Sequence, residues 1–421
     1  CMAAARALGG LDPHVRRARE PASPEEPSVQ NADPEEIAAA AGLAPRGSFP
    51  AGRSLVLRNE VGRNLLVLKP ATGQDGEARL LREAEWLRHL NRHPVPSHRR
   101  NHVPQPVFLR GNCLFRIPAS SASPLARRLP PDRPLLAFTA APDYFAYPQE
   151  HPETGIRPVR DARRILARSG FLLGRYTSQG ILHTAPVPLF HNRMQAGRRD
   201  DAGRYLWDRK GRLDRWLHSC RYPNFGGSGL RDFEHLAPYS GTSLELFRAM
   251  GTQILSLLLV AGSVFRLRQP ELVGLDERGQ AADARHLFDS RQLRLMVQTV
   301  FSNYFLGFVG RPYTGPEPSG LDRLVERMIQ ELGVDRHMNE ALRRQDQTGM
   351  SRGEFVRLLR DKGVSPDRAA RTPQGEQDIF LRTGPHLGDF NSRISLPELI
   401  DFTAGCAGTC IATRSLDALR P

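Results

Sequence analysis

The chain has 421 residues, of which 40% are hydrophobic and 25% are charged, an ordinary composition for a globular protein with room for two lobes or domains. The formal net charge is +14, but the basic residues are spread along the chain, which indicates a general arginine bias and not a stripe that binds nucleic acid. The longest uncharged stretch, 249–265, is interrupted by polar residues, so it predicts a buried helix and no membrane span.

The cysteines and the first residues bear on the compartment. The five cysteines form no disulfide framework, and the pair Cys406 and Cys410 lacks a second pair at zinc spacing. The opening CMAAARALGG has no basic start followed by an apolar run, so no signal peptide is predicted. We expect a cytoplasmic protein, with a secreted effector as the alternative.

Two elements are expected near the start of the ordered chain. Residues 1–45 are rich in Ala, Pro and Glu and are expected to be disordered, with order beginning near Gly47. Two runs rich in Leu and Val, Ser54–Arg58 and Asn64–Lys69, predict a β-hairpin. Apolar residues at helical spacing from Gly76 to Leu90 predict a helix directly after it.

More strands follow that helix. The sequence predicts strands at Val107–Arg110 and Cys113–Ile117, with a turn at Gly111-Asn112 between them, and a further strand at Leu135–Ala140. With the first hairpin they form a small, mostly antiparallel sheet lobe with one helix, over residues 46–141.

The remainder of the chain is predicted to be helical. Long helices are expected after the proline-containing stretch 141–158; they are Asp161–Gln179, Ser243–Leu267, Ser290–Phe308, Gly320–Leu332 and Ser351–Lys362. We expect a helical lobe over 142–310 and a linker with a helical C-terminal region over 311–421. The predicted fold class is therefore α+β and bilobal.

Lys69 is the first candidate for chemistry. It ends the second strand of the hairpin and is one of only three lysines in the chain. A cation there can neutralise nucleotide phosphates; the alternative is an edge-strand lysine that prevents strand pairing. Glu83 precedes the helix anchors Trp86 and Leu87 by three and four residues, so it is expected to point inward and pair with Lys69. Because a cleft lysine adds little to a core, alanine at this position should weaken phosphate contacts without unfolding the protein.

Two further segments concern phosphate binding and proton transfer. Arg53, with Gly47 and Gly52, precedes the first strand and can reach a phosphate, although the glycines form neither a Walker motif nor a three-glycine loop. In a phosphotransferase catalytic loop, a carboxylate two residues after the histidine accepts the hydroxyl proton. After His183 that residue is Ala185, so ordinary Ser/Thr phosphorylation is not expected, and His183 is either a pocket residue or a structural one.

The stretch NFGGSGLRDFEHL, residues 224–236, offers a magnesium site. Asn224 and Asp232 are hard oxygen ligands, and the glycines between them allow close backbone approach to phosphates. In this reading Asp232 holds the cation, the cation bridges the phosphates, and Lys69 and Arg53 neutralise the remaining charge. The alternative is a polar loop that caps the next helix.

The order of these features resembles a protein kinase. In LLVLK, REAEWL, ILHTAPVPLFHN and GLRDFEHL it resembles the SidJ-like bacterial pseudokinases in particular, and more remotely the selenoprotein O pseudokinases, over about residues 47–308. The resemblance implies a kinase-like α+β fold that uses ATP and Mg²⁺. It also implies attack at the ATP α-phosphate, with either glutamylation of a protein side chain through an acyl-adenylate or transfer of AMP.

The resemblance also assigns roles. It implies Lys69, Glu83 and Asp232 as catalytic residues, Lys69, His183 and Asn224 as nucleotide-binding residues, and Asn224 and Asp232 as metal ligands. Arg53, from its place before the first strand, is a further nucleotide-binding candidate. Where the SidJ group has a further acidic ligand, this chain has His235. The alternatives are a catalytically inactive pseudokinase scaffold that binds nucleotide, and a small-molecule phosphotransferase with its base in the segment 199–201.

The expected partner is a protein substrate, and a protein activator is an open alternative. Calmodulin is not expected, because Ile329-Gln330 is followed by Val334 where an IQ motif requires Arg. No nucleic-acid or membrane partner is expected.

Overall fold

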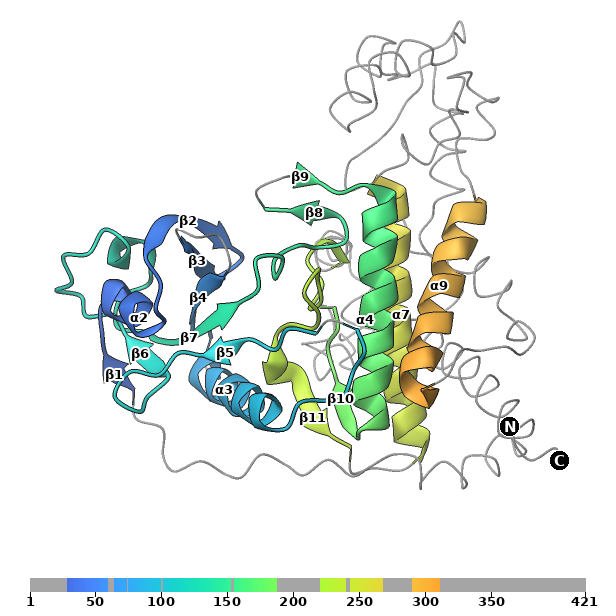
Figure 1. Ribbon diagram of the computed structural model, residues 1–421, viewed down its shortest axis with the longest axis horizontal. Coiled ribbons are helices and arrows are strands. Elements are labelled where there is room, and N and C mark those ends of the chain that lie inside the picture. Colours follow the sequence, from blue (N-terminus) through green and yellow to red (C-terminus); the bar gives the residue numbers. More distant parts are fainter. Residues whose placement is uncertain are drawn as a thin grey trace, which may run out of the picture.

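The computed structural model describes residues 29–59, 64–73, 75–99, 101–152, 155–187, 220–239, 243–267 and 290–310. Within these ranges a part built around a β-sheet lies beside a part built around long helices (Figure 1). The predicted α+β class, with a small sheet lobe and a helical region, is confirmed. The helices predicted at 320–332 and 351–362 lie outside the described residues.

The sheet has seven strands in the order β1-β6-β7-β4-β3-β2, with β5 paired to β7. The pairings are antiparallel except that of β1 with β6, as predicted for a mostly antiparallel sheet. The strands are β1 Gln30–Asn31, β2 Pro45–Ala51, β3 Ser54–Asn59, β4 Leu65–Pro70, β5 Gln105–Pro106, β6 Leu114–Arg116 and β7 Pro134–Ala140.

Helices cover both faces of this sheet. Every residue of the central strand β4 is buried, because α3 (Gly76–Arg92) packs on one face and α2 (Pro34–Ala40) belongs to the core on the other. Side chains alternate between the faces of a strand, so Lys69 shares the face of Leu65 and Val67, which belong to the core that includes α3. This alternation directs the lysine toward the helix that carries Glu83.

The start of the ordered chain corrects one prediction. The segment 1–45 was expected to be disordered, yet β1 and α2 lie within it, and Ile37 and Ala38 of α2 are buried. At the beginning of α2 the backbone N–H of Asp33 donates to the Glu36 carboxylate at 3.1 Å. Average composition missed this helix because its few apolar residues are concentrated on the face that meets the sheet.

The second predicted hairpin is also corrected. Residues 107–110 form no regular strand; pairing with β7 is made by Gln105–Pro106 instead. The turn is centred on Arg110 and Gly111, which have φ of 49° and 86°, and Leu109 and Asn112 exchange backbone hydrogen bonds across it. The turn is therefore one residue earlier than predicted.

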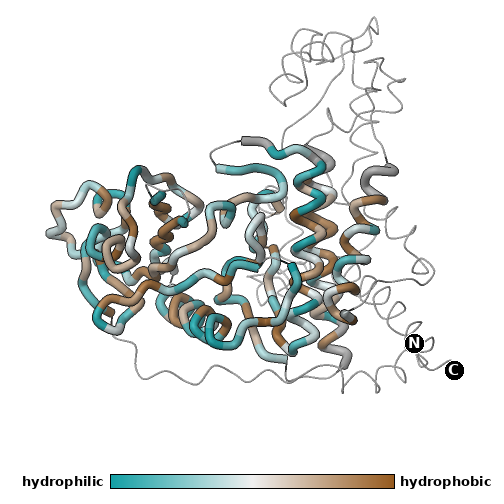
Figure 2. Tube along the Cα trace, in the orientation of Figure 1, coloured by the Kyte–Doolittle hydropathy of each residue, from teal (hydrophilic) through white to brown (hydrophobic). Residues whose placement is uncertain are grey.

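The helical part consists of α4 (Val159–Ser178), α7 (Ser243–Leu267) and α9 (Ser290–Val309), which stand side by side (Figure 1). The predicted bounds of all three helices agree with the observed ones to within two residues at each end. A Cβ at Gly174 of α4 would lie 2.1 Å from the Tyr304 carbonyl oxygen of α9, so only glycine permits this close approach. Hydrophobic and hydrophilic residues alternate along α4 (Figure 2), with the hydrophobic ones in the core.

Helix α7 was predicted to be buried. Its described side chains between Ile254 and Ala261 are fully or nearly fully buried, which confirms this. In the described part of the chain, no helix is both long enough and apolar enough to cross a membrane.

Two short two-stranded sheets lie between the large sheet and the long helices. Strand β8 (Glu150–His151) pairs with β9 (Gly155–Ile156), and β10 (Ile181–His183) pairs with β11 (Leu236–Pro238). A single 3-10 turn, η5 (Phe233–His235), immediately precedes β11. The β10–β11 pairing therefore brings the His183 loop next to the segment that contains Asp232.

Candidate functional site

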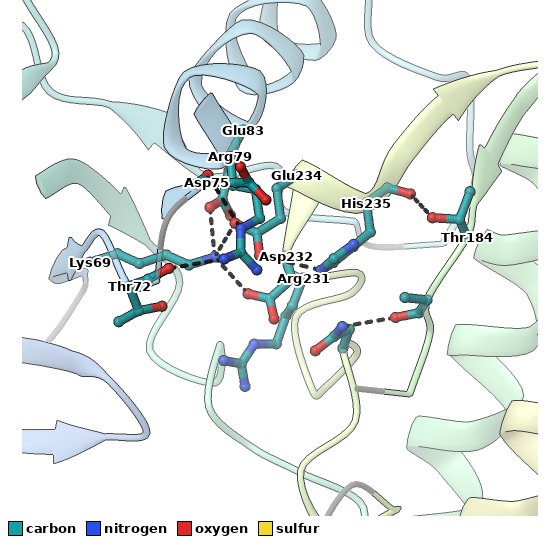
Figure 3. Close-up of polar contacts among 12 residues, drawn as sticks. Lys69, Thr72, Asp75, Arg79, Glu83, Thr184, Arg231, Asp232, Glu234 and His235 are labelled. Atoms are coloured by element: carbon teal, nitrogen blue, oxygen red, sulfur yellow. Dashed lines mark hydrogen bonds and ion pairs between the residues drawn. The ribbon is translucent and has the colours of Figure 1, made fainter. Parts of the chain in front are cut away.

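A buried ion cluster joins the sheet to the segment after the glycine-rich turn (Figure 3). The Lys69 Nζ atom lies 2.6 Å from Glu83 Oε2, 2.9 Å from Asp232 Oδ1 and 3.6 Å from Glu234 Oε2. The predicted pair of Lys69 with Glu83 is therefore present, and Asp232 belongs to the same cluster. The side chain of Asp232 is 23% exposed whereas that of Lys69 is 5% exposed, so Asp232 is the member that a ligand reaches more easily.

Local structure explains why these side chains converge. Glu83 lies on the buried stripe of α3, three residues after Leu80 and four before Leu87, a spacing that places all three on one helix face. Asp232 has φ 49° and ψ 61°, a left-handed conformation that Asp tolerates better than most residues. The buried ring of Phe233 follows directly and anchors this turn.

The charges in the cluster shift one another's pKa. Burial lowers the pKa of Lys69, but the negative charges of Asp232, Glu83 and Glu234 together raise it by more. The pKa of Lys69 is therefore above its usual value. Burial raises the pKa of Glu83, and Lys69 only partly offsets that rise. For Asp232 and Glu234, burial raises the pKa, but Lys69 together with other neighbouring donors and cations outweighs burial and holds the pKa of both carboxyls below its ordinary value. Lys69 is thus protonated, and Asp232 and Glu234 are carboxylates at neutral pH.

Arg53 reaches the cluster from the turn between β2 and β3. Its Nη2 atom lies 3.2 Å from Glu234 Oε1 and 3.1 Å from Glu234 Oε2, and Nη1 donates to Thr72 Oγ1 at 2.7 Å. Gly52 precedes it with φ of 58°, which glycine adopts without strain. The predicted phosphate-binding arginine is therefore in the cluster, where a carboxylate holds its guanidinium.

Asn224 is held beside the loop that follows β10. Its side-chain Nδ2 donates to the Ala185 carbonyl oxygen at 2.8 Å, and its backbone carbonyl accepts from Arg231 N at 2.9 Å. Asn224 and Arg231 thus face each other across the glycine-rich hairpin, and Asp232 is the next residue along the chain. The methyl group of Ala185 is buried, so this position supplies no proton acceptor, as the sequence indicated.

His183, predicted as either a pocket residue or a structural one, is held in place by main-chain contacts. Its side chain is buried, Nε2 lies 2.9 Å from the Arg231 carbonyl oxygen, and Nδ1 accepts a hydrogen bond from Ala185 N at 3.3 Å. Both ring nitrogens therefore face the main chain, and burial lowers the pKa of His183 to about 4. The neutral imidazole joins the loop after β10 to the residue before Asp232.

Two members of the site were not predicted from the sequence. Glu234 is a buried carboxylate that contacts both Lys69 and Arg53; its signal was the spacing of two residues from Asp232. Arg231 is 8% exposed, and its guanidinium lies 4.4–4.8 Å from the ring centroids of Tyr144, Phe145 and Tyr147. Such stacking of a cation on aromatic faces is attractive, and it fixes the residue before Asp232 to the segment after β7.

The donor set suits magnesium. A carboxylate and a carboxamide oxygen, from Asp232 and Asn224, are hard donors, and Mg²⁺ typically takes one or two carboxylates together with phosphate oxygens and water. In the ranges that the structure describes, no group of three or more His, Cys, Asp or Glu is arranged to hold a metal ion. The two hard oxygens therefore match the donor chemistry of magnesium.

Comparisons with known proteins add little to this geometry. No protein-family model and no curated protein matches the chain. Among solved structures it is similar to an aminoglycoside phosphotransferase from Alicyclobacillus acidocaldarius subsp. acidocaldarius, with 12% identity, a TM-score of 0.31, and coverage of 82% of this chain and 95% of that one. A similarity this low assigns neither a substrate nor an activity.

The ion cluster joins the two parts of the fold. A two-part α+β architecture carries a strand lysine paired with a helix glutamate, and an aspartate from the other side completes the cluster.

Proposed function

We propose that the protein binds ATP with Mg²⁺ and transfers a group to a protein side chain by attack at the α-phosphate. The observation that carries the proposal is the contact of Lys69 with both Glu83 and Asp232, because it sets a phosphate-binding cation beside a partly exposed metal-binding acid. Asp232 and Asn224 would hold the cation, which supplies charge neutralisation for the phosphates. Lys69 and Arg53 would neutralise the rest.

The missing base supports transfer of a group other than the γ-phosphoryl. Ala185 is buried where a protein kinase has its proton-accepting carboxylate, so a hydroxyl nucleophile finds no base there. Glutamylation through an acyl-adenylate uses a carboxylate nucleophile that needs no deprotonation, so the missing base favours it. AMP transfer is the related reaction with a hydroxyl and would need a base from another position. Both rest on the resemblance to the SidJ-like and selenoprotein O pseudokinases, as does the choice of a protein acceptor.

A second candidate is a catalytically inactive scaffold that binds nucleotide. The observation that favours it is the same apolar side chain of Ala185. A small-molecule phosphotransferase would have to recruit a base from elsewhere, and the candidate segment 199–201 lies outside the described residues.

Labelled ATP separates these functions. With Mg²⁺ and a cell lysate, transfer of α-label to protein supports adenylylation, and AMP release that requires added glutamate supports glutamylation. Transfer of γ-label would refute attack at the α-phosphate, and nucleotide binding without turnover would leave the scaffold.

The site assignment has its own test. Asp232→Asn should abolish Mg²⁺-dependent ATP binding, because it removes the charged oxygen donor. The matched control is Glu150→Gln, which removes a carboxylate paired with Arg221 outside the cluster and should leave binding unchanged. Undiminished Mg²⁺-dependent binding by Asp232→Asn would show that the metal lies elsewhere.

A further inference from the structure

The pair of Arg53 with Glu234 connects the β2–β3 turn to the segment after Asp232. The two residues are 181 positions apart in the sequence, and the guanidinium contacts both carboxylate oxygens of Glu234 at 3.1 and 3.2 Å. The side chain of Arg53 is 26% exposed and that of Glu234 is 2% exposed. A cation from one side of the cluster is thus held by an acid from the other side.

Glu234 makes the contacts that a phosphate group would make. Its carboxylate lies between the two cations of the cluster, 3.1 Å from Arg53 Nη2 and 3.6 Å from Lys69 Nζ. Arginine binds carboxylates and phosphates with the same donor geometry. An anionic ligand that binds Arg53 Nη2 therefore competes with Glu234 for that nitrogen.

If a phosphate displaces Glu234 from Arg53, the negative charge of the Glu234 carboxylate remains in the cluster without that partner. Three cations balance three carboxylates here: Lys69, Arg53 and the neighbouring Arg231 face Glu83, Asp232 and Glu234. When phosphates take over Arg53, the Glu234 carboxylate loses the Nη2 group that contacts both of its oxygens. It remains close to the other carboxylates, so like charges are no longer balanced in a partly buried site. Such an imbalance is costly at low effective dielectric unless another cation enters.

We infer that Glu234 is a specificity-determining residue: it occupies Arg53 in the ligand-free protein and selects Mg²⁺-bound nucleotide over free nucleotide. Metal-free ATP must displace Glu234 without bringing compensating charge, whereas the Mg²⁺ complex brings that charge with it. The inference rests on the proposed nucleotide binding and adds that a residue of the protein sets the metal requirement.

The test is titration of the full-length chain with ATP, once in Mg²⁺ and once in EDTA. Glu234→Gln should bind ATP in EDTA about tenfold more tightly than the wild type, since one hydrogen bond to a charged group is worth about that much in affinity. The ratio of affinities with and without Mg²⁺ should shrink accordingly. Placed in an Arg53→Gln background, Glu234→Gln should produce little gain, because the competition for Arg53 no longer exists.

The controls separate this competition from other roles. Glu150→Gln removes an Arg-paired carboxylate outside the cluster and should not change ATP binding in EDTA. If Glu234→Gln does not fold, Glu234→Asp provides the same test, because its shorter side chain retracts the carboxylate from Arg53. Thermal unfolding of each variant shows whether it is folded.

Several results would overturn the inference. If wild type binds ATP with Mg²⁺ and Glu234→Gln shows no gain in EDTA, the selection by Glu234 is wrong while the nucleotide site stands. An equal gain with and without Arg53 would also refute it, because the effect would then be one of net charge. If no variant binds ATP under either condition, the proposed function fails together with the inference.

Discussion

The buried ion cluster makes Lys69 important for folding as well as for binding. From the sequence, alanine at this position was expected to leave the protein folded. In the structure Lys69 is 4% exposed and Glu83 is 0% exposed, and Lys69 also contacts Asp232 and Glu234. We now predict that Lys69→Met destabilises the protein strongly, because it leaves buried carboxylates without their shared cation.

The size of the effect follows from burial. Removing one partner of a buried ion pair costs about 3–5 kcal/mol. For a domain of this size that corresponds to a fall in Tm of about 10 °C. An exposed pair sets the lower reference: Arg221→Met breaks a pair with Glu150 in which the arginine side chain is 49% exposed, and it should cost no more than about 1 kcal/mol.

The effect should depend on pH. Burial already raises the pKa of Glu83, and loss of Lys69 raises it further. A group whose folded pKa is raised contributes stability below its unfolded pKa and loses it as pH rises through the folded pKa. The Tm difference between wild type and Lys69→Met should therefore be smaller at about pH 5 than at about pH 8.

Thermal unfolding followed by circular dichroism or calorimetry at the two pH values measures this prediction. Lys69→Met/Glu83→Gln should recover part of the lost stability, because it removes the buried charge that the single variant leaves uncompensated. The reasoning is refuted if Lys69→Met unfolds at the wild-type temperature at both pH values, or if the double variant is less stable than the single one.

Two further predictions concern the surroundings of the site. Burial lowers the pKa of His183 from 6.5 to about 4, so as pH falls the histidine is protonated in the unfolded chain first, and up to about 3 kcal/mol of stability is lost between these two pH values. The free energy of unfolding in urea should therefore depend less on pH for His183→Gln than for wild type over this range. An identical pH profile for the two proteins would contradict this. Gly174→Ala should lower Tm despite the higher helix propensity of alanine, because its Cβ would meet the Tyr304 carbonyl oxygen, at a cost of about 1–3 kcal/mol. The matched control is Gly47→Ala, which has nothing within 4 Å of the added Cβ and should be neutral. Equal Tm values for the two variants would show that α4 and α9 are not in close contact.

The local features of the site could be read from the sequence. Alternation along a strand places Lys69 on the face of Leu65 and Val67, and helical spacing from Leu87 places Glu83 on the buried stripe. These assignments succeed because backbone geometry sets the period of two or of 3.6 residues whatever the surroundings. For the same reason the three long helices were predicted.

Other features depend on packing between segments that are far apart in the chain. Residues 29–45 are ordered only because the sheet presents an apolar face to α2, which the composition of that segment does not reveal. The contact of Arg53 with Glu234 joins residues 181 positions apart. Whether the pKa of each buried carboxyl is raised or lowered depends on which cations the fold brings close to it. Periodicity determines which face a side chain takes, whereas only the tertiary structure decides which charges share that face and how much water remains to screen them.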